Sequence, residues 1–170
     1  MSKVSGKIET VANVLIIIVA LLLIGVIVQR YFFAKPEPSQ RAQIEPTVGK
    51  QINLPDENFS AQPKTVVLAL QTGCHFCNES APFYKRLVES AKGKNIKIVA
   101  VFPTPVEESA AHLNQLGVTG MEVKQAPISA LDASGTPTLI LTNQKGEVTN
   151  YWVGKLSADK EQEVINQINS

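Results

Sequence analysis

The sequence predicts an α/β domain in which strands and helices alternate, preceded by an N-terminal transmembrane helix. Three observations lead to this prediction. Short runs rich in valine, isoleucine and leucine alternate with helical patterns over residues 45–170. A Cys-x-x-Cys motif, Cys74 to Cys77, stands between the first of these runs and a helical stretch. Residues 14–28 contain no polar side chain, which is typical of a membrane span.

The apolar segment at the N-terminus covers residues 11–33. A helix of about 20 residues crosses the hydrocarbon core of a bilayer. The aromatic residues Tyr31, Phe32 and Phe33 suit the interface at its end. A cleaved signal peptide would have a shorter apolar region and a small-x-small cleavage site, whereas two phenylalanines precede Ala34. We therefore predict an uncleaved signal anchor at residues 11–33, which binds the lipid bilayer.

The flanks of this segment define the rest of the domain organisation. Residues 1–10 form a short tail, and residues 34–44 are polar and proline-bearing, as in an extended linker. Lysine and arginine flank both sides of the segment, so charge alone does not decide the orientation. A folded domain after a single N-terminal span is most simply exported, and a Cys-x-x-Cys motif meets disulfide substrates outside the cytoplasm. We predict a single-pass cell-membrane protein with a cytoplasmic N-terminus and an extracytoplasmic domain, in the periplasm or on the outer face.

Charge excludes one class of function. The chain has 16 Lys and Arg against 15 Asp and Glu, and residues 45–170 are slightly acidic. Such a domain has no excess of positive charge to attract phosphate groups, so nucleic acid is not a predicted partner. Its length suits one compact domain.

The first half of the domain reads as strand, helix, strand, helix. Residues 65–70 form a buried strand, and residues 77–92 a helix. Residues 96–102 form a second strand, and residues 107–116 a helix ended by Gly117. The predicted packed face of the first helix consists of Phe83, Leu87, Val88 and Ala91.

The second half adds two strands and a helix. Residues 138–142 form the third strand, and Gly146 allows a turn into an antiparallel fourth strand, residues 147–153. Ser157 is a plausible N-cap for the last helix, because acidic residues follow it and favour the helix start. The predicted order is βαβαββα.

The two cysteines are the chain's only ones, so each is the other's only intramolecular partner. Two intervening residues at a helix start place the sulfurs within disulfide distance. Unpaired amides and the helix dipole stabilise a thiolate there. The motif therefore predicts reversible thiol–disulfide chemistry, with the first sulfur exposed and the second turned inward.

The element order, the position of Cys74-x-x-Cys77 and the segment Gly135-Thr136-Pro137-Thr138 before the third strand resemble the thioredoxin-fold superfamily. Within it, further residues resemble the membrane-anchored TlpA/ResA-type thiol-disulfide oxidoreductases. These are Val48-Gly49-Lys50, Leu54-Pro55-Asp56, Pro82 and the segment 136–141 that leads to Gly146. The resemblance implies a thioredoxin-like fold over residues 45–170, with a central mixed sheet flanked by helices.

The same resemblance implies roles for two further residues. Pro137 would be a cis-proline facing the cysteine pair, and the Thr136 backbone would bind an extended polypeptide substrate. A cis X-Pro bond is accessible because the tertiary amide has only a weak trans preference. The implied cofactor is none beyond the redox-active disulfide, and no metal is predicted.

Several positions depart from the family pattern. Gly73 stands where tryptophan is common, and no proline separates the cysteines. Leu68 and Ser80 stand where relatives carry an acid. Glu79 is adjacent, but one residue turns about 100° around a helix, so its side chain should point elsewhere. The proton shuttle for Cys77 is therefore missing or displaced.

The residues between the cysteines have two interpretations each. An imidazolium at His75 would favour the Cys74 thiolate and make the disulfide easier to reduce, or His75 is simply solvated at a helix start. Phe76 is either a substrate-contacting residue of the rim or a ring packed against the fold. We treat both as candidate active-site modulators.

The predicted function is reduction of protein disulfides, with Cys74 as the nucleophile and Cys77 as the resolving cysteine. The predicted partners are a protein thiol or disulfide substrate and a membrane electron donor or thioredoxin-like redox partner. A protein disulfide oxidase or isomerase is an alternative, because the chemistry is reversible. A copper or zinc module using the cysteines with His75 or His112, and a non-catalytic adaptor, are alternatives of another class. The motif falls short of a strong zinc spacing.

Overall fold

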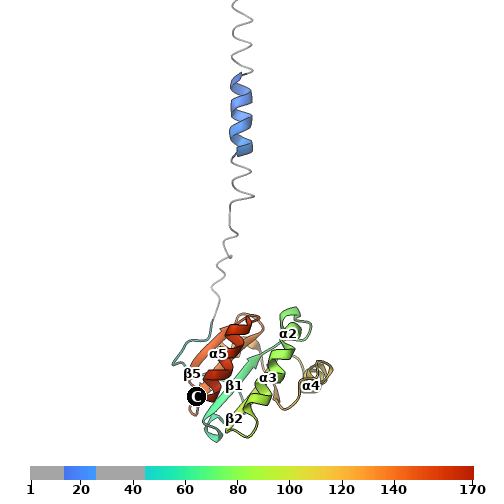
Figure 1. The fold of residues 1–170 in the computed structure, drawn as a ribbon, viewed down its shortest axis with the longest axis vertical. Helices are drawn as coiled ribbons and strands as arrows, with labels where there is room; N and C mark the ends of the chain where they lie inside the picture. The colour runs from blue at the N-terminus through green and yellow to red at the C-terminus, as the bar shows by residue number, and fades with distance from the viewer. Residues whose placement is uncertain (1–13, 26–44) are drawn as a thin grey trace, which may run out of the picture. The chain divides into compact units, whose positions relative to one another are not determined.

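The computed structural model describes residues 14–25 and 45–170. Residues 45–170 belong to one compact unit, and the helix over residues 14–25 belongs to a separate one. This helix is apolar throughout and is drawn in blue in Figure 1. Within the described ranges, no helix is both long and apolar enough to cross a membrane. The rest of the predicted anchor, with the tail and the linker, lies outside the described residues.

A five-stranded sheet forms the centre of the domain, with the strand order β3-β2-β1-β4-β5. Strand β1 pairs in parallel with β2, and β2 with β3, whereas β4 is antiparallel to both β1 and β5. The predicted mixed sheet is therefore confirmed. The strands are β1 (Lys64–Ala69), β2 (Ile96–Phe102), β3 (Glu122–Gln125), β4 (Thr138–Asn143) and β5 (Val148–Val153).

Helices α3 and α5 pack against each other and cover one face of the sheet (Figure 1). Short 3-10 helices, η2 and η3, contribute to the other face. The helices are α2 (His75–Glu79), α3 (Ala81–Ala91), α4 (Val106–Gln115) and α5 (Ala158–Asn169), with η2 at Phe59–Ala61 and η3 at Ile128–Leu131.

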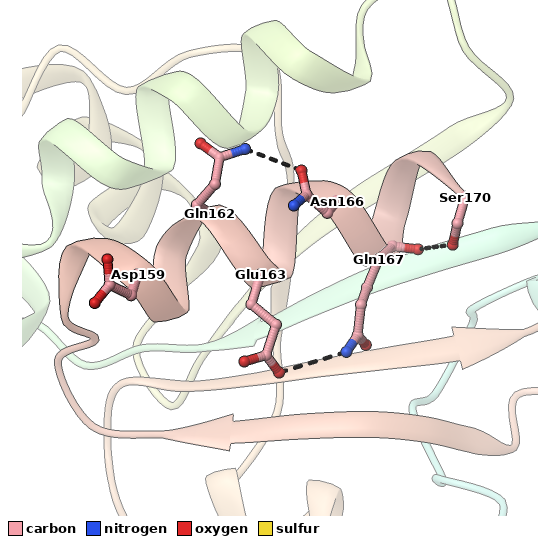
Figure 2. Close-up of a pocket in the computed structure, with 6 residues that line it drawn as sticks. All are labelled: Asp159, Gln162, Glu163, Asn166, Gln167 and Ser170. Atoms are coloured by element: carbon pink, nitrogen blue, oxygen red, sulfur yellow. Dashed lines mark hydrogen bonds between the residues drawn. The ribbon is translucent and has the colours of Figure 1, made fainter.

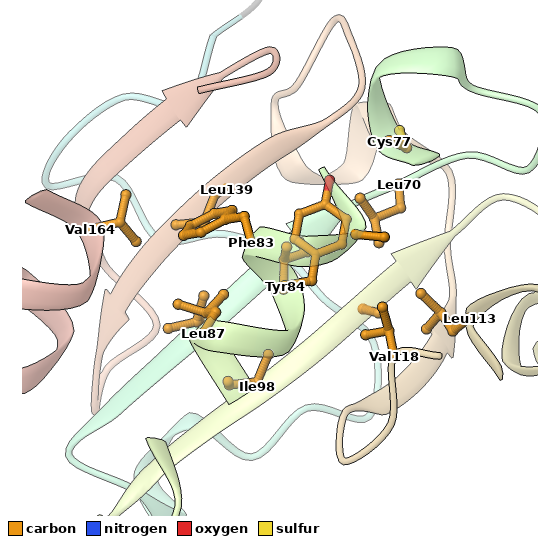
Figure 3. Packing of buried hydrophobic residues seen from close by; sticks show 14 of the residues in the cluster. Leu70, Cys77, Phe83, Tyr84, Leu87, Ile98, Leu113, Val118, Leu139 and Val164 are labelled. Atoms are coloured by element: carbon orange, nitrogen blue, oxygen red, sulfur yellow. The ribbon is translucent and has the colours of Figure 1, made fainter. Parts of the chain in front are cut away.

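Side chains that alternate along β1 separate two apolar cores, because successive strand residues point to opposite faces. Val66 and Leu68 enter the core beneath α3 and α5, which Figure 3 shows from close by. Val67 and Ala69 enter the core beneath η2 and η3. The central strands are buried on both faces, which explains why they read as continuous apolar runs.

Two features of the predicted element order are wrong. The single helix at 77–92 is two helices that meet at Ser80. Pro82 lacks an N–H group and cannot continue the hydrogen-bond ladder from α2, which favours a break there. The prediction also omitted β3, a four-residue strand of mixed polarity at the sheet edge.

Ser157 does occupy the N-cap position of α5, but its side chain makes no capping hydrogen bond.

Candidate active site

The cysteine pair lies at the start of α2. Helix α2 follows the end of β1 (Figure 1). Cys74 is the N-cap residue, and its Sγ accepts a hydrogen bond from the Cys77 N–H at 3.1 Å. The two residues are disulfide-bonded, with their Cα atoms 5.2 Å apart. Cys74 is half-buried, whereas Cys77 is only 3% exposed. The first sulfur is thus the one that a substrate can approach.

The loop before β4 approaches the same sulfur from the neighbouring strand, because Thr138 at the start of β4 pairs with Ala69 at the end of β1. The Thr136–Pro137 peptide bond is cis, in agreement with the prediction. The backbone oxygen of Thr136 lies 3.5 Å from the Cys74 Sγ. The Gly154 N–H donates to the Pro137 carbonyl at 2.7 Å, which ties this loop to the end of β5. The structure therefore brings together Cys74, Cys77, Thr136 and Pro137.

His75 and Phe76 both project into solvent. The Phe76 side chain is 54% exposed, so it is not packed against the fold. The Nε2 atom of His75 lies 3.2 Å from a Glu79 carboxylate oxygen, and the other oxygen of Glu79 lies 2.9 Å from Lys155. The hydrogen bond from Lys155 lowers the pKa of Glu79, with a smaller contribution from His75. The Glu79 carboxylate is thus paired with His75 and Lys155.

A chain of hydroxyl groups fixes the segment that precedes the cysteines. Thr72 Oγ1 lies 3.2 Å from Thr104 Oγ1, which lies 2.8 Å from the Oγ atom of the buried Ser109. On the same helix, α4, His112 Nε2 lies 3.1 Å from Asn78 Oδ1. The Nε2 atom of the His112 imidazole thus has its hydrogen-bond partner in the Asn78 side chain of α2. In the described part of the chain, no three His, Cys, Asp or Glu side chains cluster around a possible metal position.

A narrow pocket behind the cis-proline is the part of the site that the sequence analysis missed. Ser80, Tyr84 and Pro137 line it, together with Leu68 and other apolar side chains. Tyr84 is 2% exposed, and its hydroxyl group has no hydrogen-bond partner. Burial raises the pKa of this hydroxyl well above its usual range, although the neighbouring Ser80 opposes the shift. The signal in the sequence was the spacing of Ser80 and Tyr84, three and seven residues after Cys77.

A second hollow lies on the outer surface of α5, and Figure 2 shows its lining. Its volume is about 510 Å³. All its side chains come from one helix and its end, and they bond to one another, as Gln162 does to Asn166 at 3.0 Å. None of the residues that line it belongs to the cysteine site.

Several solved structures of other proteins resemble the domain over most of its length. The chain has the thioredoxin fold. A protein assigned as the thiol:disulfide interchange protein DsbE from Chlorobium tepidum is 19% identical with a TM-score of 0.61, over 74% of this chain and 97% of that one. A thiol-disulfide isomerase from Corynebacterium glutamicum is 15% identical with a TM-score of 0.55, over 75% and 96% of the two chains.

The thioredoxin domain of a thiol-disulfide oxidoreductase from Bacteroides vulgatus is 16% identical with a TM-score of 0.54, over 73% of this chain and 96% of that one. No family model matches the sequence, and no curated protein matches it significantly. The likeness therefore concerns the fold, and the function has to be argued from the site.

Proposed function

We propose that this protein is a membrane-anchored thiol-disulfide oxidoreductase that reduces protein disulfides outside the cytoplasm. The observation that carries the proposal is the position of Cys74. Its sulfur is half-exposed at the start of α2, accepts the Cys77 amide at 3.1 Å and lies 3.5 Å from the Thr136 backbone oxygen. A helix start favours a thiolate. A sulfur in this position is suited to attack a substrate disulfide.

The reaction proceeds in two exchanges. The Cys74 thiolate attacks one sulfur of the substrate disulfide, and the other substrate sulfur leaves as a thiolate that takes a proton from water. Cys77 then loses its proton to water and attacks the Cys74 sulfur. The mixed disulfide breaks, the second substrate thiol leaves, and the protein keeps the Cys74–Cys77 disulfide. A membrane electron donor or a thioredoxin-like partner returns the two electrons.

The loop at Thr136 and Pro137 supplies the binding surface for an extended substrate segment. Its backbone lies beside the Cys74 sulfur, so a peptide paired with this loop would place its disulfide over the nucleophile. The exposed Phe76 ring extends the same rim. These features support a protein substrate rather than a small thiol alone.

The apolar segment at residues 11–33 supports the anchor. Its described part, residues 14–25, is helical, and its valine, leucine and isoleucine side chains are exposed rather than packed in a core. A continuous apolar surface of this kind is typical of a segment that contacts lipid or another apolar partner. The proposed topology has residues 1–10 in the cytoplasm, residues 34–44 as a tether and the domain on the periplasmic or outer face.

The deciding measurement is the reduction potential of the Cys74–Cys77 disulfide in the full chain, held in detergent micelles and equilibrated with glutathione or dithiothreitol. A value near or below about −270 mV supports a reductase. A value near about −120 mV makes the protein a disulfide donor instead. Failure to form a reversible disulfide would overturn redox function and favour the metal-binding or adaptor alternatives.

The anchor and orientation need a separate experiment. We expect the full chain to sediment with membranes and to resist extraction by alkaline carbonate. A membrane-impermeant thiol reagent should label Cys74 in intact cells after mild reduction. Soluble protein would contradict the anchor, and labelling only after cell lysis would contradict the orientation.

A further inference from the structure

Tyr84 is the one described residue near the cysteines whose buried polar group has no partner. Its side chain is 2% exposed, and its hydroxyl oxygen makes no hydrogen bond. A buried hydroxyl left without a partner is destabilising. The proposed two-exchange reaction does not use this group. Its position relative to Cys77 suggests what it does.

Ser80, where α2 meets α3, is three residues after Cys77 and four residues before Tyr84, and the Tyr84 N–H donates to the Ser80 carbonyl at 3.1 Å. Helical side chains lean toward the N-terminus, so the Tyr84 ring extends back over the turn that carries Ser80. Figure 3 shows the hydroxyl of Tyr84 pointing toward the end of the sheet where Cys77 lies. The small side chain at Ser80 leaves the space into which the ring extends.

Two of the residues that line the pocket that Tyr84 enters lie close to the cysteines in the chain. Ser80 follows Cys77 by one helical turn, and its Oγ donates to the Phe76 carbonyl at 2.8 Å, which leaves its lone pairs available. On the other side, Pro137 follows Thr136, whose backbone oxygen lies 3.5 Å from the Cys74 sulfur. The pocket has an interior volume of about 10 Å³. That is about the space for the centre of one water molecule.

Nothing charged lines this pocket. Its other lining residues are apolar apart from Thr138, whose Oγ1 donates to the Gly135 carbonyl at 2.8 Å. The titratable groups on the neighbouring elements have partners at the surface. His75 and Lys155 both bond to Glu79, and His112 bonds to Asn78. The side chains that line the pocket therefore offer a thiolate at Cys77 neutral hydroxyl groups and no charge.

We propose that the Tyr84 hydroxyl, acting through one water in this pocket, donates a hydrogen bond to the Cys77 thiolate in the resolving step. The proposal rests on the proposed function and makes Tyr84 a positioning residue of that same site. The proton of Cys77 passes to solvent water, and the tyrosine keeps its own. Burial keeps Tyr84 protonated while the thiols titrate, so it acts as a donor and not as a base. A hydrogen bond to the charged form lowers a thiol's pKa.

The test uses the full chain in detergent micelles with Cys74→Ser, which leaves Cys77 as the only cysteine. Isotope-labelled cysteine then gives one NMR signal whose shift follows thiolate formation with pH. We expect Tyr84→Phe to raise the titration midpoint by about one pH unit, a tenfold loss of thiolate. The matched control is Tyr151→Phe, whose hydroxyl instead bonds to Glu45 at 3.0 Å, and it should leave the midpoint unchanged.

Equal midpoints in the two tyrosine variants, or a lower midpoint in Tyr84→Phe, would overturn the proposal. Thermal unfolding provides the check on folding, because Tyr84→Phe removes an oxygen that has no partner among the protein atoms and should leave Tm at or above that of the wild type. A Tm increase without a midpoint shift would mean that the hydroxyl has no role at Cys77.

The outcome is separable from that of the proposed function. The wild-type chain is assayed in parallel for reduction of a protein disulfide. Wild-type turnover with an unmoved Cys77 midpoint overturns the role of Tyr84 alone. A moved midpoint in a chain whose wild type has no turnover overturns the proposed function, while the hydrogen bond to Cys77 stands.

Discussion

The pocket behind the cysteines and the edge of the sheet at β3 both bury polar groups, but with opposite chemistry. In the pocket, Ser80 and Tyr84 are buried and neutral, and no charged side chain lines the walls. At the β3 edge, the Glu57 side chain has no exposed surface and lies 2.7 Å from Lys97 and 3.1 Å from Lys124. The pocket has no charged side chain in its lining, whereas the β3 edge pairs a buried carboxylate with two lysines.

The two regions are therefore expected to affect different properties of the protein, namely the redox chemistry of the cysteines and the stability of the fold. A charged side chain close to Cys77 would shift the pKa of that thiol through its charge, whereas a neutral hydroxyl group shifts it only through a hydrogen bond to the thiolate. At the β3 edge, the paired charges hold the segment before η2 against a strand that has only one neighbour. We expect substitutions in the first region to change redox behaviour, and substitutions in the second to change the free energy of unfolding.

The largest effect should come from the cysteines themselves. Cys74→Ser removes the exposed nucleophile, so reduction of a protein disulfide should fall by roughly a thousandfold or more. Cys77→Ser keeps the nucleophile but cannot resolve, and it should accumulate a mixed disulfide detectable by mass spectrometry. Both variants should keep the wild-type fold by circular dichroism. An active Cys74→Ser protein would refute the assignment of the nucleophile.

Glu57→Gln should sharpen the comparison at the other region. Removing one partner of a buried ion pair leaves the lysines uncompensated, and we expect a loss of about 3 kcal/mol in the free energy of unfolding. Urea denaturation measures it. Glu89→Gln is the matched control, since Glu89 pairs with Lys92 while 69% exposed, and it should change stability by less than about 1 kcal/mol. Equal effects in the two variants would show that burial at Glu57 is unimportant.

The reduction potential should be the same in Glu57→Gln and the wild type. The Glu57 carboxylate pairs with lysines of β2 and β3 and not with residues of the cysteine site. A shift comparable to that of an active-site variant would break the separation between the two regions.

Much of the fold could be predicted from the sequence because its central strands are buried on both faces. The runs at 65–70 and 96–102 are apolar for that reason, and β2 has the predicted bounds. Strand β3 could not be found this way, since its residues Glu122–Gln125 show no alternation. Its pairing with β2 defines it, and that is a long-range contact.

The candidate site was predicted in the same uneven way. The cysteine motif and the Thr-Pro segment are local patterns, and the structure brings them together. Lys155, which pairs with Glu79, and the lysines that pair with Glu57 come from distant segments, so no local pattern reveals these contacts. Tyr84 was absent from the predicted packed face of the helix because a tyrosine can be exposed or buried, and only the fold determines which.

The pH dependence of stability should come from the β3 edge rather than from the cysteine pocket. A hydrogen bond from Lys97 lowers the pKa of Glu122 below 4.5. Burial acts to lower the pKa of Lys97, but hydrogen bonds to Glu122 and Glu57 outweigh it and raise that pKa above 10.5. The Glu122 contribution is present above its unfolded pKa and is lost as pH falls through the lower folded value. The Lys97 contribution is lost as pH rises through its folded value.

Thermal unfolding across pH measures this dependence. Glu122→Gln cannot titrate at position 122, so its Tm should fall less than that of the wild type when pH drops below 4.5. Identical slopes in the acid range would assign the pH dependence to other carboxylates.

The smallest effect should come from Glu79, which is charged but lies on the exposed side of the cysteine motif. Glu79→Gln removes the carboxylate that bonds to His75 and Lys155, so positive charge near Cys74 becomes uncompensated. This favours the thiolate, and the disulfide should become easier to reduce by less than about 30 mV. Solvent screens these groups, which keeps the shift small. Glu89→Gln is again the control, and its potential should equal that of the wild type. A shift in the opposite direction would mean that Glu79 acts on Cys74 through something other than its charge.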